Sequence, residues 1–160
     1  ELKAEARAEI DAVLEMGGWD THANQGAADG RLARNLKLLG DGLATLPDHL
    51  GPAWKKTVVA VVTEFGRTGR PNGSRGTDHG TASAAFLLGG AVDGGRVVGR
   101  WPGLAANDLY QGRDLAPTGD MRSLFKAVLK DQFGLTRSSL DNEVFPNSAG
   151  VAPAVNLIRT

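Results

Sequence analysis

The run Thr57-Val58-Val59-Ala60-Val61-Val62-Thr63 has no charged residue and no break in its apolar character between its two threonines. Six of its seven residues are β-branched, and β-branched side chains favour strands. A near-continuous apolar run, without alternation of polar residues, is typical of a strand buried on both faces, as in a parallel sheet. The run therefore predicts a buried strand.

A long amphipathic helix is predicted upstream of this strand, from about residue 28 to 50. Its apolar face carries leucines at alternating steps of four and three, namely Leu32, Leu36, Leu39, Leu43, Leu46 and Leu50. That spacing is the signature of one helix face. Residues 10–16, which end at Gly17-Gly18, are interpreted as a preceding strand. Strand, helix and strand form a βαβ unit, so the expected fold class is α/β, with a largely parallel sheet flanked by helices.

Further elements are expected downstream. A second helix is predicted over residues 121–133, with Asp120 as its N-cap and Gly134 as its C-terminal stop. Residues 82–88 are a second apolar run, and residues 96–99 resemble a short strand. Glu1 to Glu9 favour helix by composition. Residues 1–160 are expected to form a single α/β domain, in which 141–160 are an irregular tail.

The composition excludes several classes of protein. Lys plus Arg and Asp plus Glu both number 18, so no net charge attracts the chain to nucleic acid or anionic lipid. The absence of cysteine excludes disulfides, thiolate zinc sites and cysteine nucleophiles. No apolar stretch reaches about 18 residues, so no membrane span is expected. We therefore expect neither a nucleic-acid partner nor a membrane anchor within this chain.

Three short motifs place carboxylates and imidazoles among glycines. They are Gly17-Gly18-Trp19-Asp20-Thr21-His22, Thr63-Glu64-Phe65-Gly66-Arg67-Thr68 and Gly76-Thr77-Asp78-His79-Gly80. The first two follow predicted strands, at the sheet edge where open α/β folds place their ligands. Carboxylates and imidazoles are ligands of hard and borderline divalent metals. The motifs predict a metal-dependent site, and the alternative for each is a polar turn that caps a strand.

The spacing within these motifs suggests how the side chains could meet. Asp20 and His22 are two residues apart, so in an extended segment both point to the same side. Glu64 follows the predicted buried strand, where an unpaired carboxylate is costly to desolvate. A cation would relieve that cost, and so would an ion pair between Glu64 and Arg67. Asp78-His79 offers an oxygen and a nitrogen ligand in one turn.

Arginines between the second and third motifs could bind an anionic substrate. Arg67, Arg70 and Arg75 lie there, and a guanidinium matches phosphate or sulfate oxygens with two parallel hydrogen bonds. The alternative is a solvated basic loop. His49 lies near the end of the leucine-rich helix, and we expect it to interact with the helix C-terminus rather than with a metal.

Taken together, the three motifs resemble a bacterial domain-of-unknown-function family, number fifteen hundred and one. The similarity runs from about Asp11 to Pro146 and includes the later segments Asp-Leu-Ala-Pro-Thr-Gly-Asp and Val-Phe-Pro-Asn-Ser. Members of that family often carry twin-arginine export signals and are grouped with the alkaline phosphatase and sulfatase superfamily. The resemblance thus implies an alkaline-phosphatase-like α/β fold, a periplasmic or exported location, and a divalent metal ion such as zinc, calcium or magnesium.

By that analogy Asp20, His22 and His79 would hold one metal ion, and Glu64 or Asp78 would serve a second. The implied activity is metal-dependent hydrolysis of phosphate or sulfate esters, with a small anionic ester as the substrate. The alternative is a non-catalytic exported protein of the same fold that binds metal or a partner.

Two departures from the superfamily pattern bear on that analogy. Glu64-Phe65 stands where relatives have Asp-His, which removes a nitrogen ligand. The superfamily's nucleophilic Ser or Thr, together with its first metal aspartate, lies in an upstream segment that this chain does not contain. We therefore expect the chain to be the C-terminal part of an N-terminally truncated domain, and no catalytic nucleophile is assigned.

Overall fold

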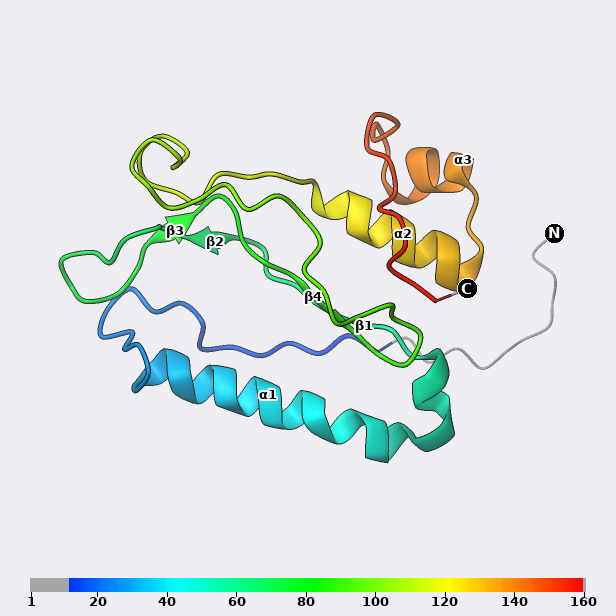
Figure 1. Cartoon of the computed structure of the whole chain (residues 1–160), viewed down its shortest axis with the longest axis horizontal. Helices are drawn as coiled ribbons and strands as arrows, with labels where there is room; N and C mark the ends of the chain where they lie inside the picture. The colour runs from blue at the N-terminus through cyan, green and yellow to red at the C-terminus, as the bar shows by residue number, and fades with distance from the viewer. Residues whose placement is uncertain (1–11, 160) are drawn as a thin grey trace.

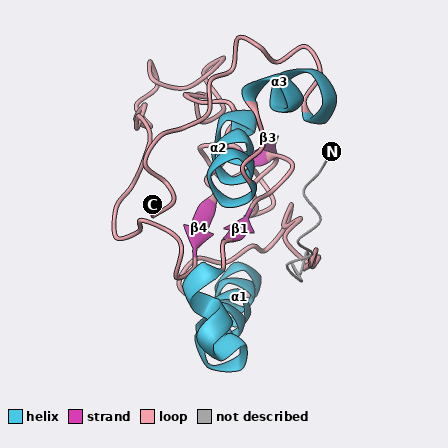
Figure 2. Cartoon of the chain, turned by 90° about the vertical axis from the view of Figure 1, so that its right-hand side faces the viewer, coloured by secondary structure: helices cyan, strands magenta, loops and turns pink. Residues whose placement is uncertain are grey.

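The computed structural model describes residues 12–159. The helix predicted over Glu1 to Glu9 lies outside that range, as do the first two residues of the strand predicted over 10–16. Figure 1 shows the longest helix, α1 (Arg31–Leu50), along one side of the molecule, with α2 (Met121–Phe133) and α3 (Arg137–Ser139) toward the opposite side. Strands β1 (Val59–Val61) and β4 (Phe86–Leu88) lie between α1 and α2, also in the end view of Figure 2. Strands β2 (Gly66–Arg67) and β3 (His79–Gly80) lie beside α2, over the start of α1.

The expected largely parallel sheet is wrong. The described residues contain two small antiparallel pairs instead: β1 (Val59–Val61) with β4 (Phe86–Leu88), and β2 (Gly66–Arg67) with β3 (His79–Gly80). No parallel pairing, and hence no βαβ unit, is found between residues 12 and 159. The α/β class and the alkaline-phosphatase-like architecture that depended on such a sheet are overturned with it.

Two glycines help to explain this antiparallel pairing. A Cβ at Gly89 would lie 2.1 Å from the carbonyl oxygen of Thr57, and one at Gly90 would lie 2.4 Å from that of Trp54. Only glycine allows the backbone after β4 to pack this closely against the residues before β1. The β-branched run therefore pairs with a segment less than 30 residues downstream, and Ala60, at the centre of β1, is exposed.

Two other predicted strands are also absent. Residues 12–16 and 96–99 have no regular secondary structure, and Val97 is 99% exposed. The apolar run 82–88 forms a strand only in its last three residues, as β4. Apolar character alone therefore overestimated the number of strands: residues 12–16 and 96–99 pair with no strand, and the run 82–88 pairs with β1 only through Phe86–Leu88.

The leucine-rich helix is confirmed as α1 (Arg31–Leu50). Pro47 lies in its last turns without ending it, and the backbone N–H of Gly51 donates to the carbonyl of Pro47. The leucines that form the apolar face of α1 are half-buried and not part of the core, and one of them, Leu36, is exposed. A 3₁₀ helix, η1 (Gly51–Lys56), connects α1 to β1.

The second predicted helix is confirmed as α2 (Met121–Phe133), and so are both of its ends. The side chain of Asp120 accepts a hydrogen bond from the backbone N–H of Arg122 at 2.9 Å, as an N-cap does. Gly134 has the left-handed conformation (φ 71°) that ends many helices, and its N–H donates to the carbonyl of Lys130. Both ends are thus determined by local residues.

The predicted irregular tail contains some helix and part of the core. A single turn, α3 (Arg137–Ser139), continues into a π-helical turn, η2 (Leu140–Val144). The remaining residues have almost no regular structure. The hydrophobic core includes residues from the tail, β4's flank and α2: Ala91, Val92, Ala127, Leu157 and Ile158.

A fully buried lysine anchors this tail. Lys126 of α2 has no exposed surface, and its Nζ donates to the carbonyl oxygens of Ser148 (2.7 Å) and Val151 (3.0 Å) and to the carboxylate of Asp141. Arg137 also pairs with Asp141. A buried ammonium is tolerated only when paired and hydrogen-bonded, and these three acceptors meet that condition.

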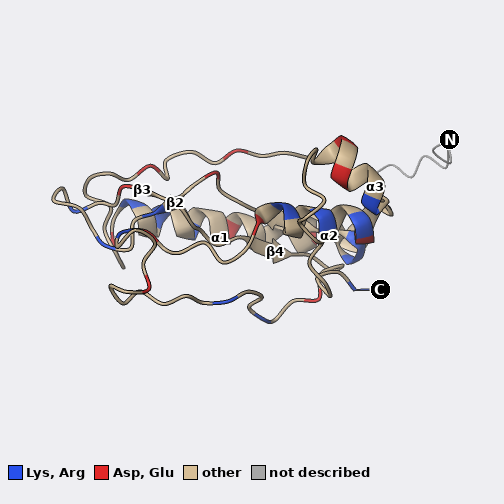
Figure 3. Ribbon diagram, turned by 90° about the horizontal axis from the view of Figure 1, so that it is seen from above, with Lys and Arg blue, Asp and Glu red and all other residues tan. Residues whose placement is uncertain are grey.

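Charged residues are interspersed by sign along the ribbon rather than gathered into one patch (Figure 3). Within the described part of the chain, no helix combines the length and the apolar character needed to cross a lipid bilayer.

We predict that Lys126→Met destabilises the protein by about 3 kcal/mol, the lower end for removing one partner of a buried ion pair. The substitution keeps the length of the side chain but removes the donor to the carbonyl of Val151 and one of the two cationic partners of buried Asp141. Urea denaturation measures the effect. Lys130→Met is the matched control on the same helix, because Lys130 is exposed and, within residues 12–159, its side chain pairs only with Asp131. Equal free energies of unfolding for the two variants would contradict the prediction.

A second prediction concerns pH. Hydrogen bonds from the side chain and backbone of Arg122 lower the pKa of the Asp120 carboxyl to about 2. The unfolded value is higher, about 4, so the ionised carboxylate stabilises the folded state above that pH. The contribution is lost as the pH falls from about 4 to about 2. Asp120→Asn keeps a capping oxygen but cannot titrate, so its free energy of unfolding should fall less steeply across this window. An equal loss of free energy of unfolding in the wild type and in Asp120→Asn between about pH 4 and pH 2 would refute this prediction.

Candidate metal centre

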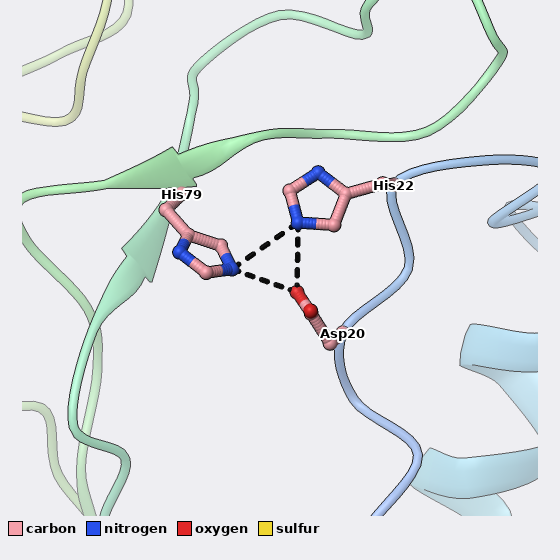
Figure 4. Close-up of side chains that lie close together, drawn as sticks. All are labelled: Asp20, His22 and His79. Atoms are coloured by element: carbon pink, nitrogen blue, oxygen red, sulfur yellow. Dashed lines mark hydrogen bonds and ion pairs between the residues drawn. The ribbon is translucent and has the colours of Figure 1, made fainter.

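Three of the predicted ligands converge on one point. The Oδ1 of Asp20 lies 3.0 Å from the Nε2 of His22 and 2.8 Å from the Nε2 of His79, and the two Nε2 atoms are 3.2 Å apart (Figure 4). About half of each side chain is exposed to solvent. These three atoms form an open triangle on the surface, which we call the Asp-His-His triangle.

The triangle is assembled by pairing between two distant segments. Asp20 and His22 lie on a segment without regular secondary structure, in which the N–H of Thr21 donates to the carbonyl of Trp19 at 2.9 Å, and their side chains reach the same point. His79 lies on β3, opposite Arg67 of β2. The backbone N–H of Thr77 donates to the carbonyl of Thr21 at 3.2 Å, which joins the two segments next to the triangle.

A glycine permits this close approach. A Cβ at Gly76 would lie 2.3 Å from both the carbonyl carbon and the carbonyl oxygen of His22, closer than any real Cβ contact. The third motif therefore requires glycine at this position for steric reasons. The glycines around the motifs were expected to permit close backbone approach, and Gly76 does so.

Arg67 holds the two segments together. Its Nη1 donates to the carbonyl of Thr77 (2.8 Å), and its Nη2 donates to the carbonyl of Trp19 (2.8 Å) and to Oδ1 of Asp20 (2.6 Å). Its side chain is only 22% exposed. The carboxylate partner of Arg67 is thus Asp20 rather than Glu64, and its guanidinium is occupied by groups of this chain.

Phe65 supports His79, a role that the sequence did not reveal. The two rings stack with centroids 4.0 Å apart and an interplanar angle of 25°, and the Arg67 guanidinium lies 5.6 Å from the Phe65 centroid. Phe65, which stands where relatives have a histidine, thus packs against the candidate ligand His79. No sequence signal distinguishes such a ring from an ordinary apolar residue after a strand.

Asn72 organises the loop between β2 and β3. Its Oδ1 accepts from the backbone N–H groups of Ser74 (2.9 Å) and Gly76 (3.1 Å). Its Nδ2 donates to the carbonyl of His22 (2.9 Å) and to the carboxylate of Asp78 (2.8 Å). Pro71-Asn72-Gly73 is a typical turn sequence in which the asparagine side chain bonds nearby backbone, but its contact with His22 could not be read from it.

The other predicted site residues lie outside the triangle. Asp78 contacts the second ring nitrogen of His22, with Oδ1 3.1 Å from Nδ1. Glu64 and Arg75 are exposed, and neither side chain makes a hydrogen bond or ion pair with any residue from 12 to 159. His49 contacts the carbonyl of Thr45 at 2.8 Å in the last turns of α1, as expected.

The surrounding donors stabilise the ionised carboxylates. The hydrogen bond from His79, followed by that from Arg67, holds the pKa of Asp20 below its usual value. The hydrogen bond from Asn72, followed by that from His22, does the same for the pKa of Asp78. Both carboxylates are therefore anionic at neutral pH.

The residues present fit a zinc ion. Ligand atoms bonded to a tetrahedral zinc at about 2.0–2.1 Å are about 3.3 Å apart, close to the 2.8–3.2 Å separations in the triangle. Two imidazoles and one carboxylate with an open fourth position are a donor set of catalytic zinc sites. Calcium and magnesium take mostly oxygen ligands, six or more in number, and fit less well.

The comparison with protein-family models gives one match. The model described as Protein of unknown function (DUF1501) matches residues 9–145, most of the chain, so the chain belongs to this family. The resemblance inferred from the three motifs is confirmed. No curated protein and no solved structure matches the chain.

We predict that Gly76→Ala disrupts the triangle, because the added methyl group collides with the backbone of His22. Overpacking of this kind costs about 1–3 kcal/mol, and NMR contacts between the His22 and His79 rings should weaken. Gly73→Ala, in the same loop, is the matched control, since a Cβ there meets no atom within 4 Å. Preserved ring contacts in Gly76→Ala would show that the close approach is unnecessary.

Proposed function

We propose that this chain, a member of the DUF1501 family, binds one divalent metal ion through Asp20, His22 and His79, and that zinc fits best. The supporting observation is the convergence of three ligand atoms from distant parts of the sequence, since His79 is 59 residues from Asp20 and 57 from His22. Polar turns that only cap strands do not require a carboxylate oxygen and two imidazole nitrogens to lie within 3.2 Å of one another.

We further propose that the metal site serves the hydrolysis of a phosphate or sulfate ester. Zinc in a site with an open position acts as a Lewis acid toward such oxygens. Exposure of about half of each ligand side chain leaves room for a small anionic ester to approach. The cationic group nearest to the ligands, Arg67, acts through Asp20, which it holds in place with a 2.6 Å hydrogen bond.

Other groups of the chain complete this proposal. Arg75 and Arg70 lie in the exposed loop between β2 and β3, and we assign Arg75 to the substrate anion because the guanidinium of Arg67 is already engaged. Thr21 is not the nucleophile in this proposal, since it is 2% exposed and donates to the Oε1 of Gln25 at 2.8 Å. The nucleophile stays unassigned. A periplasmic or exported location is proposed from the family resemblance alone.

One observation favours a second function, a metal-binding protein without catalysis. The triangle lies on the surface, and none of its three residues is buried. Hydrolytic metal sites are commonly set in dry, shaped cavities. A surface site would suit metal capture or a metal-bridged contact equally well.

Zinc titration by calorimetry tests the metal site. We expect His22→Ala, His79→Ala and Asp20→Asn each to weaken zinc binding by more than about 100-fold, beyond the 10–100-fold typical of residues outside the ligand shell. His49→Ala is the matched control for loss of an imidazole. Glu64→Gln should also bind as the wild type does, because Glu64 lies outside the triangle.

Turnover separates the two functions. Zinc-dependent hydrolysis of an aryl phosphate or aryl sulfate, abolished by His79→Ala, supports the hydrolase. Zinc binding without turnover of either ester supports the non-catalytic metal-binding protein. Failure of the wild type to bind zinc, manganese or cobalt would refute both.

A further inference from the structure

We propose that Gln25 is a positioning residue that anchors the metal site to α1, an inference that rests on the function proposed above. The Asp-His-His triangle is carried by a segment without regular secondary structure and by a hairpin of two-residue strands. Ligands must be held closely in place, and helices hold side chains more precisely than loops do. The contacts of Gln25 connect both ligand-bearing segments to α1.

The side chain of Gln25 joins the two segments that carry the ligands. Its Oε1 accepts hydrogen bonds from the hydroxyl of Thr21 at 2.8 Å and from the hydroxyl of Thr77 at 2.6 Å. An amide oxygen has two lone pairs, so this one atom can satisfy both donors. Thr21 lies between the first two ligands in the sequence, and Thr77 lies two residues before His79. One amide therefore links the chain at all three ligands.

The backbone of Gln25 makes the connection to the helix. Its carbonyl accepts from the N–H of Leu32, in the first turn of α1, at 3.0 Å. That N–H needs such a partner because the N-cap of α1, Gly30, has no side chain to offer. The N–H of Gln25 donates in turn to the carbonyl of Arg75 at 2.9 Å, in the loop that leads to β3. One residue thus fixes α1, the first ligand segment and this loop relative to one another.

Burial makes the amide of Gln25 hard to replace. Thr21 is 2% exposed, and Gln25 and Thr77 are half-buried. Buried hydroxyls need hydrogen-bond partners. Within residues 12–159, the hydroxyl of Thr21 has one other acceptor, the carbonyl of Trp19 at a long 3.4 Å, and the hydroxyl of Thr77 has none. Because Arg67 still joins the two segments, loss of the amide should loosen the triangle without dismantling it.

Zinc affinity and the visible absorption of the cobalt(II)-loaded protein test this role. Gln25→Met keeps the length of the side chain but removes the amide. We expect it to bind zinc about 10-fold more weakly than the wild type, at the lower end for residues outside the ligand shell. The cobalt absorption should shift as well, because it reports the geometry of the ligands. Gln25→Glu, which keeps an acceptor oxygen in the same place, should recover most of the loss.

Gln132→Met is the matched control for a lost glutamine amide. The Nε2 of Gln132, near the end of α2, donates to the carbonyl of Lys56 at 2.6 Å, and Figure 1 shows this end of α2 on the opposite side of the molecule from β2 and β3. It should bind zinc as the wild type does. Thr77→Val, which removes one of the two hydroxyls, should weaken zinc binding and add little to Gln25→Met in the double variant, because both changes break the same contact. Thr77→Ser keeps the hydroxyl and should bind normally.

The outcomes separate this inference from the proposed function. Unchanged zinc affinity and cobalt absorption in Gln25→Met would overturn the role of Gln25 and leave the metal site standing. An equal loss of affinity in Gln132→Met would also overturn it, since the effect would then be general destabilisation. If the wild type binds no metal, the proposed function fails, and NMR contacts between the His22 and His79 rings decide instead: they should weaken in Gln25→Met but not in Gln132→Met. If circular dichroism shows that Gln25→Met is unfolded, Thr77→Val decides by the same measurements.

Discussion

The guanidinium of Arg67 is the group on which the candidate site depends. Its rigid fork donates at once to the carbonyls of Trp19 and Thr77 and to the carboxylate of Asp20. Planar, charged donors of this kind give directional hydrogen bonds that a lysine cannot reproduce. Arg67 thereby holds the segment that carries Asp20 next to the hairpin that carries His79, which brings the three side chains of the Asp-His-His triangle together.

A second cationic side chain that bonds to several backbone carbonyls lies at the other end of the molecule. There the ammonium of Lys126 joins α2 to the carbonyls of Ser148 and Val151 and to Asp141. Backbone groups that are removed from water need partners, and here long stretches have no sheet or helix to supply them. Arg67 and Lys126 donate to these backbone groups instead, which helps to hold the loops of residues 12–159, where the strands are short, in defined positions.

Local features could be predicted from the sequence because their causes lie within a few residues. The leucine spacing of α1, the Asp120 cap and the left-handed Gly134 each act over one or two turns, and α2 begins and ends where they indicate. The two-residue spacing suggested that Asp20 and His22 could meet, and they do, although the backbone turns at Asp20, where the N–H of Thr21 donates to the carbonyl of Trp19. The three glycine-rich motifs likewise indicated the family, which the family comparison confirmed.

Non-local pairing was beyond such reasoning. A β-branched run favours a strand but does not select its partner or direction, and here β1 pairs antiparallel with β4, whose following residues Gly89 and Gly90 pack closely on the backbone before β1. Likewise, acidic residues in similar motifs look equivalent in sequence, although Asp20 joins the triangle while Asp78 contacts the outer nitrogen of His22. Residue types suggested the candidate ligands, whereas which of them come together follows from contacts between segments more than 50 residues apart, because only the folded chain brings those segments side by side.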